Sequence, residues 1–240
     1  VTASASQVEN ATDCLRKWWF AKVHKLKEPL KPKAEKGDVA HEVFERWLDL
    51  DAQPHRATLT VQNAWVFDDR SDPVVRETVT MQVHAAEDRV RTIDFELRFE
   101  NVSGEPFILL GAAGKGYGGF NVRPDQSNKP FRLTLAQGPL EKDALSINSP
   151  WADISWTSRD TGTAWGIAVF QHPANPDFPH DGWLLRHYGV LGAAWPHEVP
   201  YTIAPGAFVE LKYRLVLHGG DATAAVLDQR FREYLREATR

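Results

Sequence analysis

Apolar and polar residues alternate along much of the chain after about residue 58, which is the pattern of half-buried β-strands. Between residues 76 and 84, for example, polar positions separate Val79, Met81 and Val83. Further strands are expected at 58–61, 89–99, 106–110, 131–136, 164–170, 184–194 and 208–217. Gly-, Pro- and Asn-rich turns separate them, with no helix-length amphipathic stretch between. Many short strands without intervening helices predict an antiparallel β-sandwich.

The two ends of the chain show a helical period instead. Residues 4–27 carry an apolar stripe that Pro29 ends, and a second helix is expected from Asp38 to Leu50. The last helix is expected from Asp221 to Ala238, with an apolar face that packs on the sandwich.

The expected organisation is therefore a helical lead-in over residues 1–57, followed by a β-sandwich domain with a terminal helix over 58–240. The composition, 42% hydrophobic and 25% charged, is that of a soluble globular protein. No apolar run approaches the ~18 residues of a membrane span. Residues 1–6 lack the apolar stretch of a signal peptide, as do cytoplasmic proteins and processed secreted chains. Cys14 is the only cysteine, which excludes an internal disulfide and a cysteine-based zinc site.

The basic residues are concentrated near the start of the chain. Residues 16–36 hold eight Lys or Arg against two Glu, whereas the whole chain has a net charge of −4. Such a segment attracts polyanions, so nucleic-acid contact stays open, although a solvated helix surface is the commoner explanation.

A glycine-rich stretch runs from Gly111 to Phe120. It has neither the spacing of a phosphate-binding loop nor a helix after it, so a nucleotide site is not expected. The glycines instead favour tight turns at a sheet corner. Tyr117 in this loop and Arg123 on the following strand are candidates for a binding face.

Candidate chemistry is densest between Trp165 and His197. Residues 171–182 form an irregular, proline-rich loop, and such loops often carry binding groups. After it, Arg186 and Tyr188 are expected to face one way on a strand and His187 the other. Histidine suits acid–base chemistry, although a hydrogen-bonded core histidine is an equally simple reading.

Neither a metal nor a cofactor is indicated by the sequence. His172, His180 and His187 lie within range of one another, but no metal-binding spacing occurs. No serine-nucleophile motif is present either. The nine tryptophans suit stacking on sugar rings, although burial in the core is the simpler explanation for at least half of them.

A set of short motifs from about Asn63 to Arg236 resembles the PmoA-like family of β-sandwich proteins (DUF6807). The motifs are Arg91-Thr-Ile-Asp94, Gly116-Tyr-Gly-Gly119-Phe-Asn-Val-Arg123, Pro150-Trp151-Ala-Asp153, Gly166-Ile-Ala, His172-Pro-Ala-Asn175-Pro, Arg186-His187-Tyr-Gly189 and Tyr213-Arg214-Leu-Val-Leu-His218. The family is common in bacteria that degrade polysaccharides, which implies a carbohydrate-related role. The resemblance also implies a sandwich that starts near residue 62 and lacks the family's first strands.

The favoured hypothesis is accordingly a carbohydrate-binding or carbohydrate-processing sandwich. Its expected catalytic residues are His187 and Arg186, and its expected substrate-binding residues are Arg123, Trp165, Trp183, Tyr188 and His218. A non-catalytic interaction domain is a further alternative.

Residues 4–48 are similar to the first helices of RecB-like PD-(D/E)XK nucleases, on Cys14-Leu-Arg16 and Gly37-Asp-Val-Ala-His41. That resemblance implies a metal-dependent DNA nuclease using His41, Asp94, Glu210 and Lys212. The simpler reading is that Glu210 and Lys212 form the solvent-facing side of a strand whose alternate residues face the core.

Overall fold

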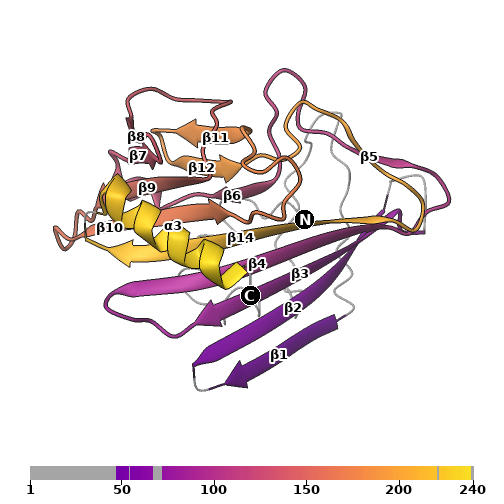
Figure 1. Cartoon of the computed structure of the whole chain (residues 1–240), viewed down its shortest axis with the longest axis horizontal. Coiled ribbons are helices and arrows are strands. Elements are labelled where there is room, and N and C mark those ends of the chain that lie inside the picture. The colour runs from indigo at the N-terminus through magenta and orange to yellow at the C-terminus, as the bar shows by residue number, and fades with distance from the viewer. Residues whose placement is uncertain (1–46, 54, 67–71, 221, 239–240) are drawn as a thin grey trace, which may run out of the picture.

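The computed structural model describes residues 47–53, 55–66, 72–220 and 222–238. Within them the chain is mainly β-structure with one α-helix near its C-terminal end (Figure 1). The elements are β1 (Trp47–Gln53), β2 (Arg56–Trp65), β3 (Val75–His84), β4 (Val90–Asn101), β5 (Phe107–Leu109), β6 (Phe120–Val122), the 3-10 helix η1 (Gln126–Asn128), β7 (Arg132–Leu135), β8 (Gly138–Leu140), β9 (Trp151–Thr157), β10 (Ala164–Gln171), β11 (Trp183–Arg186), β12 (Val190–Ala193), β13 (Tyr201–Ile203), β14 (Phe208–Gly219) and α3 (Ala224–Ala238).

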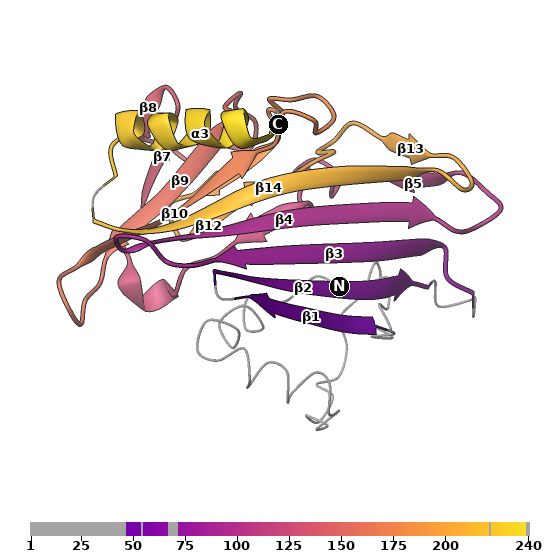
Figure 2. The ribbon, with the colours of Figure 1, turned by 60° about the horizontal axis from the view of Figure 1, so that its bottom comes forward.

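Nine strands form one large antiparallel sheet in the order β1-β2-β3-β4-β14-β10-β9-β7-β8. Strand β14, late in the chain, is inserted between β4 and β10, as the side-by-side ribbons in Figure 2 show. A smaller sheet has the order β11-β12-β6, and β13 pairs with β5. This arrangement confirms the predicted antiparallel β-sandwich.

The main core lies between the large sheet and the β11-β12-β6 sheet. On β14 every second residue from Val209 to Leu215 points into it, and the same alternation places Trp183 and Leu185 of β11 on the opposing side. Because alternate residues of a strand face opposite ways, each sheet also has an outer face directed away from this core.

The helix α3 covers part of the outer face of the large sheet (Figures 1 and 2). Leu227, Phe231 and Tyr234 recur at helical spacing and pack on Phe170 and Val216. The helix predicted from residue 221 to 238 is therefore confirmed, with its start at Ala224.

Two sequence predictions need correction. Residues Trp47–Gln53 form strand β1, so the helix expected up to Leu50 and the sandwich start near residue 62 are wrong there. The single strand expected over 184–194 is a hairpin, in which residues 187–189 form the turn between β11 and β12. The helix predicted over 4–27 lies outside the described residues.

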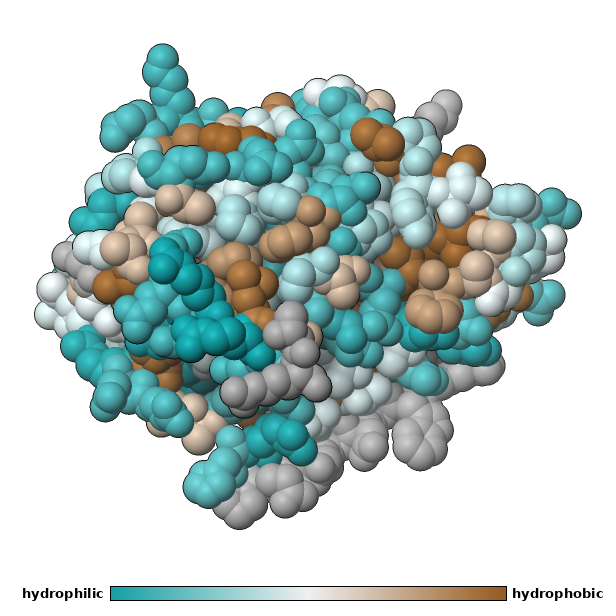
Figure 3. Space-filling view, viewed as in Figure 1, coloured by the Kyte–Doolittle hydropathy of each residue, from teal (hydrophilic) through white to brown (hydrophobic). Residues whose placement is uncertain are grey.

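The surface is mostly polar, with several smaller apolar areas in brown in Figure 3, one of them at the end that carries β5 and β13. Exposed apolar side chains near these strands include Ile108, Leu110 and Phe208. In the part of the chain described here, no helix is long and apolar enough to cross a membrane.

Candidate functional site

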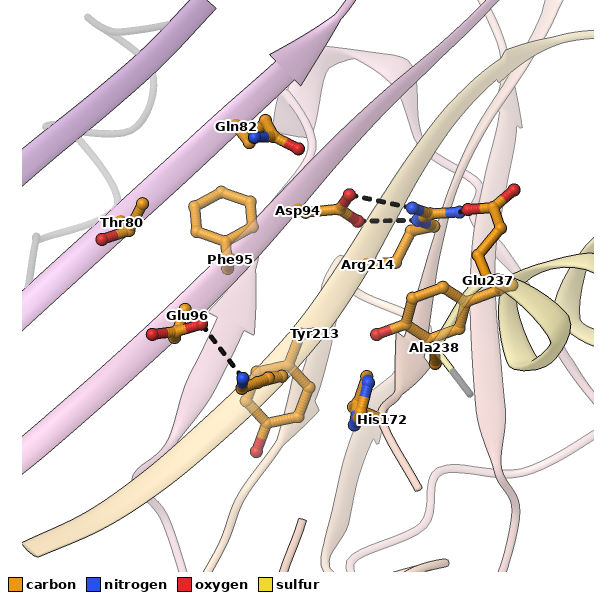
Figure 4. Close-up of a pocket in the computed structure, with 12 residues that line it drawn as sticks. Thr80, Gln82, Asp94, Phe95, Glu96, His172, Tyr213, Arg214, Glu237 and Ala238 are labelled. Carbon is orange, nitrogen blue, oxygen red and sulfur yellow. Dashed lines mark hydrogen bonds and ion pairs between the residues drawn. The ribbon is translucent and has the colours of Figure 1, made fainter. Parts of the chain in front are cut away.

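A pocket of about 270 Å³ opens on the outer face of the large sheet, beside the C-terminal end of α3 (Figure 4). Strands β3, β4 and β14 supply most of its polar lining, and α3 closes one side. The lining residues are Thr80, Gln82, Asp94, Phe95, Glu96, His172, Lys212, Tyr213, Arg214, Tyr234, Glu237 and Ala238.

The charged groups of this pocket are paired with one another. The Arg214 guanidinium donates two hydrogen bonds to Asp94, at 2.6 and 2.8 Å, and a third to Glu237 of α3 at 2.6 Å (Figure 4). His84 Nε2 lies 2.8 Å from the second oxygen of Asp94. These contacts join β3, β4, β14 and α3, so we assign the network to holding the helix on the sheet.

Asp94 makes the network sensitive to acid. Desolvation raises the pKa of Asp94, but hydrogen bonds and charge attraction from Arg214 and His84 outweigh it and hold that pKa below its ordinary value. A depressed carboxyl pKa stabilises the fold at any pH above the unfolded-state value of about 3.9, and that contribution is lost as pH falls through the folded-state pKa.

We expect Asp94→Asn to lower the free energy of unfolding by about 1.5–3 kcal/mol at pH 7, because the Arg214 guanidinium loses its charged acceptor. Urea denaturation of both proteins at pH 7 and pH 3 measures this. The difference between them should shrink at pH 3, because the Asp94 carboxyl of the unfolded parent chain, with a pKa of about 3.9, is then mostly protonated and its contribution to stability is being lost. An unchanged difference at pH 3 would contradict the assigned role.

The structure separates the residues of the nuclease hypothesis. Glu210 and Lys212 do lie on one side of β14, 2.8 Å apart, as their spacing predicts. However, Glu210 is opposite Arg98 in the register, four residues along β4 from Asp94. Four strand residues span about 13 Å, too far for two carboxylates to share one metal ion. His41 lies outside the described residues.

A different group of polar side chains lies on the outer face of the β11-β12-β6 sheet. Arg186, the last residue of β11, points away from the core residue Leu185. Its Nη2 donates to the Tyr117 hydroxyl at 3.5 Å, and its Nη1 lies 3.8 Å from Asp143 Oδ2. The glycine-rich loop thus contributes an aromatic side chain directly to the surroundings of Arg186.

His187 is held by the protein on both sides of its ring. Its Nδ1 is 2.9 Å from Asp143 Oδ1, and its Nε2 is 2.9 Å from the Leu140 carbonyl, which can only accept. The backbone N–H of His187 also donates to Asp143, at 2.8 Å. Desolvation raises the pKa of Asp143, but these bonds, with Arg186 nearby, hold that pKa below its ordinary value. Both ring nitrogens are engaged, so His187 positions the hairpin turn and Asp143.

Strand register places Arg123 in line with Arg186. Val122, the last residue of β6, pairs with Leu191, and Val190, the next residue of β12 in that direction, pairs with Arg186. Continuing the register by one residue beyond β6 puts Arg123 level with Val190. Phe120 and Val122 face the core, so the alternation directs Arg123 to the outer face. The Arg123 side chain is exposed, and within the described residues it makes no hydrogen bond or ion pair.

The glycine loop has its shape because of close backbone approaches. Gly116, at φ +62°, lies against the His197 ring, and a Cβ there would come within 2.2 Å of a ring atom. Gly119, at φ +70°, lies equally close to the Ala193 carbonyl. Only glycine fits these positions without strain, which explains the loop without any phosphate.

The family model described as "Family of unknown function (DUF6807)" matches residues 16–232. The chain belongs to this family. The match begins well before Asn63, where the motif resemblance starts, and includes β1, β2 and most of the segment that is similar to nuclease helices. That description supports neither the PmoA-like name nor a nuclease. No curated protein matches the chain significantly.

Solved structures similar to this DUF6807 chain are distant. A putative aldose 1-epimerase from Klebsiella pneumoniae is 9% identical, with a TM-score of 0.42. The match covers 78% of this chain and 58% of the epimerase chain. An alpha-galactosidase from Lactobacillus brevis is 15% identical, with a TM-score of 0.39, and the match covers 82% of this chain and 26% of the galactosidase chain. The Slr1438 protein from Synechocystis sp. PCC 6803 is 11% identical, with a TM-score of 0.34, and the match covers 71% of this chain and 65% of the Slr1438 chain. The chain thus spans less than two thirds of each of these proteins, and such distant likenesses indicate no function.

The fold of the DUF6807 chain divides the predicted site residues into separate places. Arg123, Arg186, His187 and Tyr188 lie together at the small sheet. His218 instead lies on the outer face of the large sheet, 3% exposed and 3.0 Å from Asp153, with the main core in between. The expected single face with His218 is therefore corrected.

Neither predicted tryptophan is an open platform. Trp183 is fully buried, and its Nε1 donates to the Ser149 carbonyl at 2.8 Å, so it is a core residue. Trp165 is 37% exposed, but the guanidinium of Arg89 lies over its ring at 5.2 Å. The exposed aromatic residues near Arg186 are Tyr117 and Tyr188.

Sequence reasoning missed Asp143. It lies 44 residues from His187 and has no motif around it. Only the backbone pairing of Ala144 with Leu185 brings it beside the hairpin turn. Among the residues described, no cluster of three His, Cys, Asp or Glu is suited to a metal ion.

Proposed function

We propose that this protein binds a saccharide on the outer face of the β11-β12-β6 sheet, at a surface formed by Tyr117, Arg123, Asp143, Arg186 and Tyr188, called here the arginine–tyrosine face. The observation that carries the proposal is the position of Arg186. It lies between a carboxylate and a tyrosine hydroxyl, two residues from an exposed second tyrosine.

Sugar recognition needs this mixture of groups. The apolar face of a pyranose ring stacks on a flat aromatic side chain, and its hydroxyls require donors and acceptors in fixed directions. Tyr188 is 49% and Tyr117 37% exposed, so both rings offer area to a ligand. Arg186 and Asp143 supply a donor fork and an acceptor, and His187 keeps Asp143 in place.

The pocket beside α3 is the weaker candidate for the same ligand. Its Arg214, Lys212 and Asp94 are already bonded to protein partners, so a sugar would have to break those contacts. At the arginine–tyrosine face, by contrast, Arg123 is exposed and unpaired in the described part of the chain. Surface recognition by open side chains therefore fits this fold better than binding in that pocket.

The proposal is tested by measuring binding of a panel of plant and microbial oligosaccharides by calorimetry. We expect Tyr188→Ala and Arg186→Gln each to weaken binding about tenfold or more, equivalent to about 1.4 kcal/mol. Phe208→Ala removes an aromatic side chain of similar exposure, 50%, at the start of β14, and should leave binding unchanged. Absence of binding across the panel, or equal affinity in all variants, would refute the proposal.

A further inference from the structure

The positive charge of the arginine–tyrosine face points to the chemical class of its ligand. We infer, on the basis of the proposed function, that the bound saccharide is acidic and presents a ring carboxylate to Arg123 and Arg186. This names the substrate class of the same surface and predicts a preference for uronic-acid sugars over neutral ones.

The two arginines are spaced to hold one carboxylate. Arg186 ends β11 and pairs with Val190 of β12, and Arg123 directly follows Val122, the last residue of β6. Neighbouring strands lie about 4.8 Å apart, so continuing the register by one residue puts the Cα atoms of the two arginines about 10 Å apart. Both side chains emerge on the same side of the sheet. Val190 is 1% exposed, so it offers a ligand no polar group of its own. Two guanidinium groups whose Cα atoms have this spacing can converge on a single planar anion.

Neither arginine has all of its hydrogen-bond donors engaged by strong contacts within the described protein. The contacts of Arg186, 3.5 Å to the Tyr117 hydroxyl and 3.8 Å to Asp143, are long compared with the 2.7–2.9 Å typical of charge-assisted hydrogen bonds. Arg214, on the other face of the molecule, shows the contrast, since it makes three bonds of 2.6 to 2.8 Å. Arg186 and Arg123 therefore retain donors for a bidentate contact with a ligand carboxylate.

The nearby carboxylates offset this positive charge only in part. Asp143 directs one oxygen at His187 and the other toward Arg186. Asp125, two residues from Arg123, accepts the backbone N–H of Ser127 at 2.9 Å as the cap of η1. On the other side, Lys115 lies 5.6 Å from the ring of Tyr117 and adds a further positive charge.

The test compares acidic oligosaccharides with their methyl esters, which keep the ring and remove only the charge. Oligogalacturonate, glucuronate-substituted xylan oligomers and alginate oligomers are each titrated in free and esterified form against the whole protein. For at least one pair we expect the free acid to bind about tenfold more tightly than the ester, equivalent to about 1.4 kcal/mol. Arg123→Gln should weaken binding of the free acid more than binding of the ester and so remove this preference.

Arg232→Gln on α3 is the matched control, since it removes an arginine from the helix that covers the opposite side of the large sheet. It should retain the preference for the acid. Equal binding of acid and ester by the parent protein would overturn the inference and leave the proposed function standing. Failure of every saccharide, acidic, esterified or neutral, would overturn both.

Discussion

Trp183→Ala should lower the free energy of unfolding by about 3–5 kcal/mol, because it empties a large volume in the main core. The Trp183 side chain is fully buried between the two sheets, among Leu185 and Leu191. Its indole N–H also donates to the Ser149 carbonyl. That carbonyl keeps a second donor, Gln171 Nε2 at 3.1 Å, so most of the loss comes from the cavity rather than from an unpaired oxygen.

Urea denaturation followed by circular dichroism measures the effect. Trp165→Ala is the matched control, since Trp165 is 37% exposed and lies at the start of β10. Its loss should cost about 1 kcal/mol, mainly from the contact with the Arg89 guanidinium, the size expected of an exposed cation–π pair. If Trp183→Ala instead retained full stability and lost saccharide binding, Trp183 would be the stacking platform that the sequence suggested, and its place in the core would be wrong.

The alternating strands were the predictable part of the fold. Strands β4 and β14 each have one face packed in the main core and one in contact with water or α3, and period-2 alternation reports such a difference between faces. Strand β9 was missed because its first five residues are buried on both faces, under the core on one side and α3 on the other. A strand buried on both sides has no alternation to detect.

The hairpin β11-β12 was hidden for a related reason. Apolar residues on both sides of Arg186-His187-Tyr188 suggest one continuous strand. The chain turns at this polar group because Gly189 takes up φ +106°, a conformation that favours glycine. If the sequence pattern had indicated this turn, Arg186 would have been expected at the end of one strand and Tyr188 in the turn, and not both on the same face of one strand.

The sequence indicated which types of residue could form a binding site, but it was harder to predict which of these residues lie together in the fold. Arg186, His187 and Tyr188 are neighbours in sequence and needed no long-range information. Asp143 and Tyr117 reach Arg186 only through strand pairing and loop packing. His218 is not part of this site, because its even-numbered position on β14 directs its side chain to the outer face of the large sheet, away from the core. Arg186 lies on the outer face of the other sheet.

The motif residues that the arginine–tyrosine face does not use have a structural explanation. Gly166 of β10 pairs with His218 of β14 on one side and Ser155 of β9 on the other, and Asp153 lies two residues along β9 from Ser155. A Cβ on Gly166 would come within 2.3 Å of the His218 ring, so glycine makes room for that ring. The Asp153 carboxylate and His218 Nε2 are then 3.0 Å apart and almost completely buried.

His218→Leu should therefore cost about 3–5 kcal/mol of unfolding free energy near neutral pH, since it leaves a buried carboxyl group without its partner. Burial already raises the pKa of Asp153, with His218, Ser155 and Arg132 opposing the shift. Removing the imidazole takes away part of that opposition, so the pKa of Asp153 should rise further in the variant.

The sign of the resulting pH dependence follows from proton binding. A carboxyl whose pKa is raised in the folded state binds its proton more tightly there than in the unfolded chain, where the pKa is about 3.9. Its contribution to stability therefore falls as pH rises from about 4 through the folded-state pKa. In chemical denaturation between pH 4 and pH 7, His218→Leu should lose more stability than the double variant Asp153→Asn/His218→Leu, which carries no carboxyl at this position. Parallel profiles for the two proteins would show that Asp153 is not the group that His218 keeps in place.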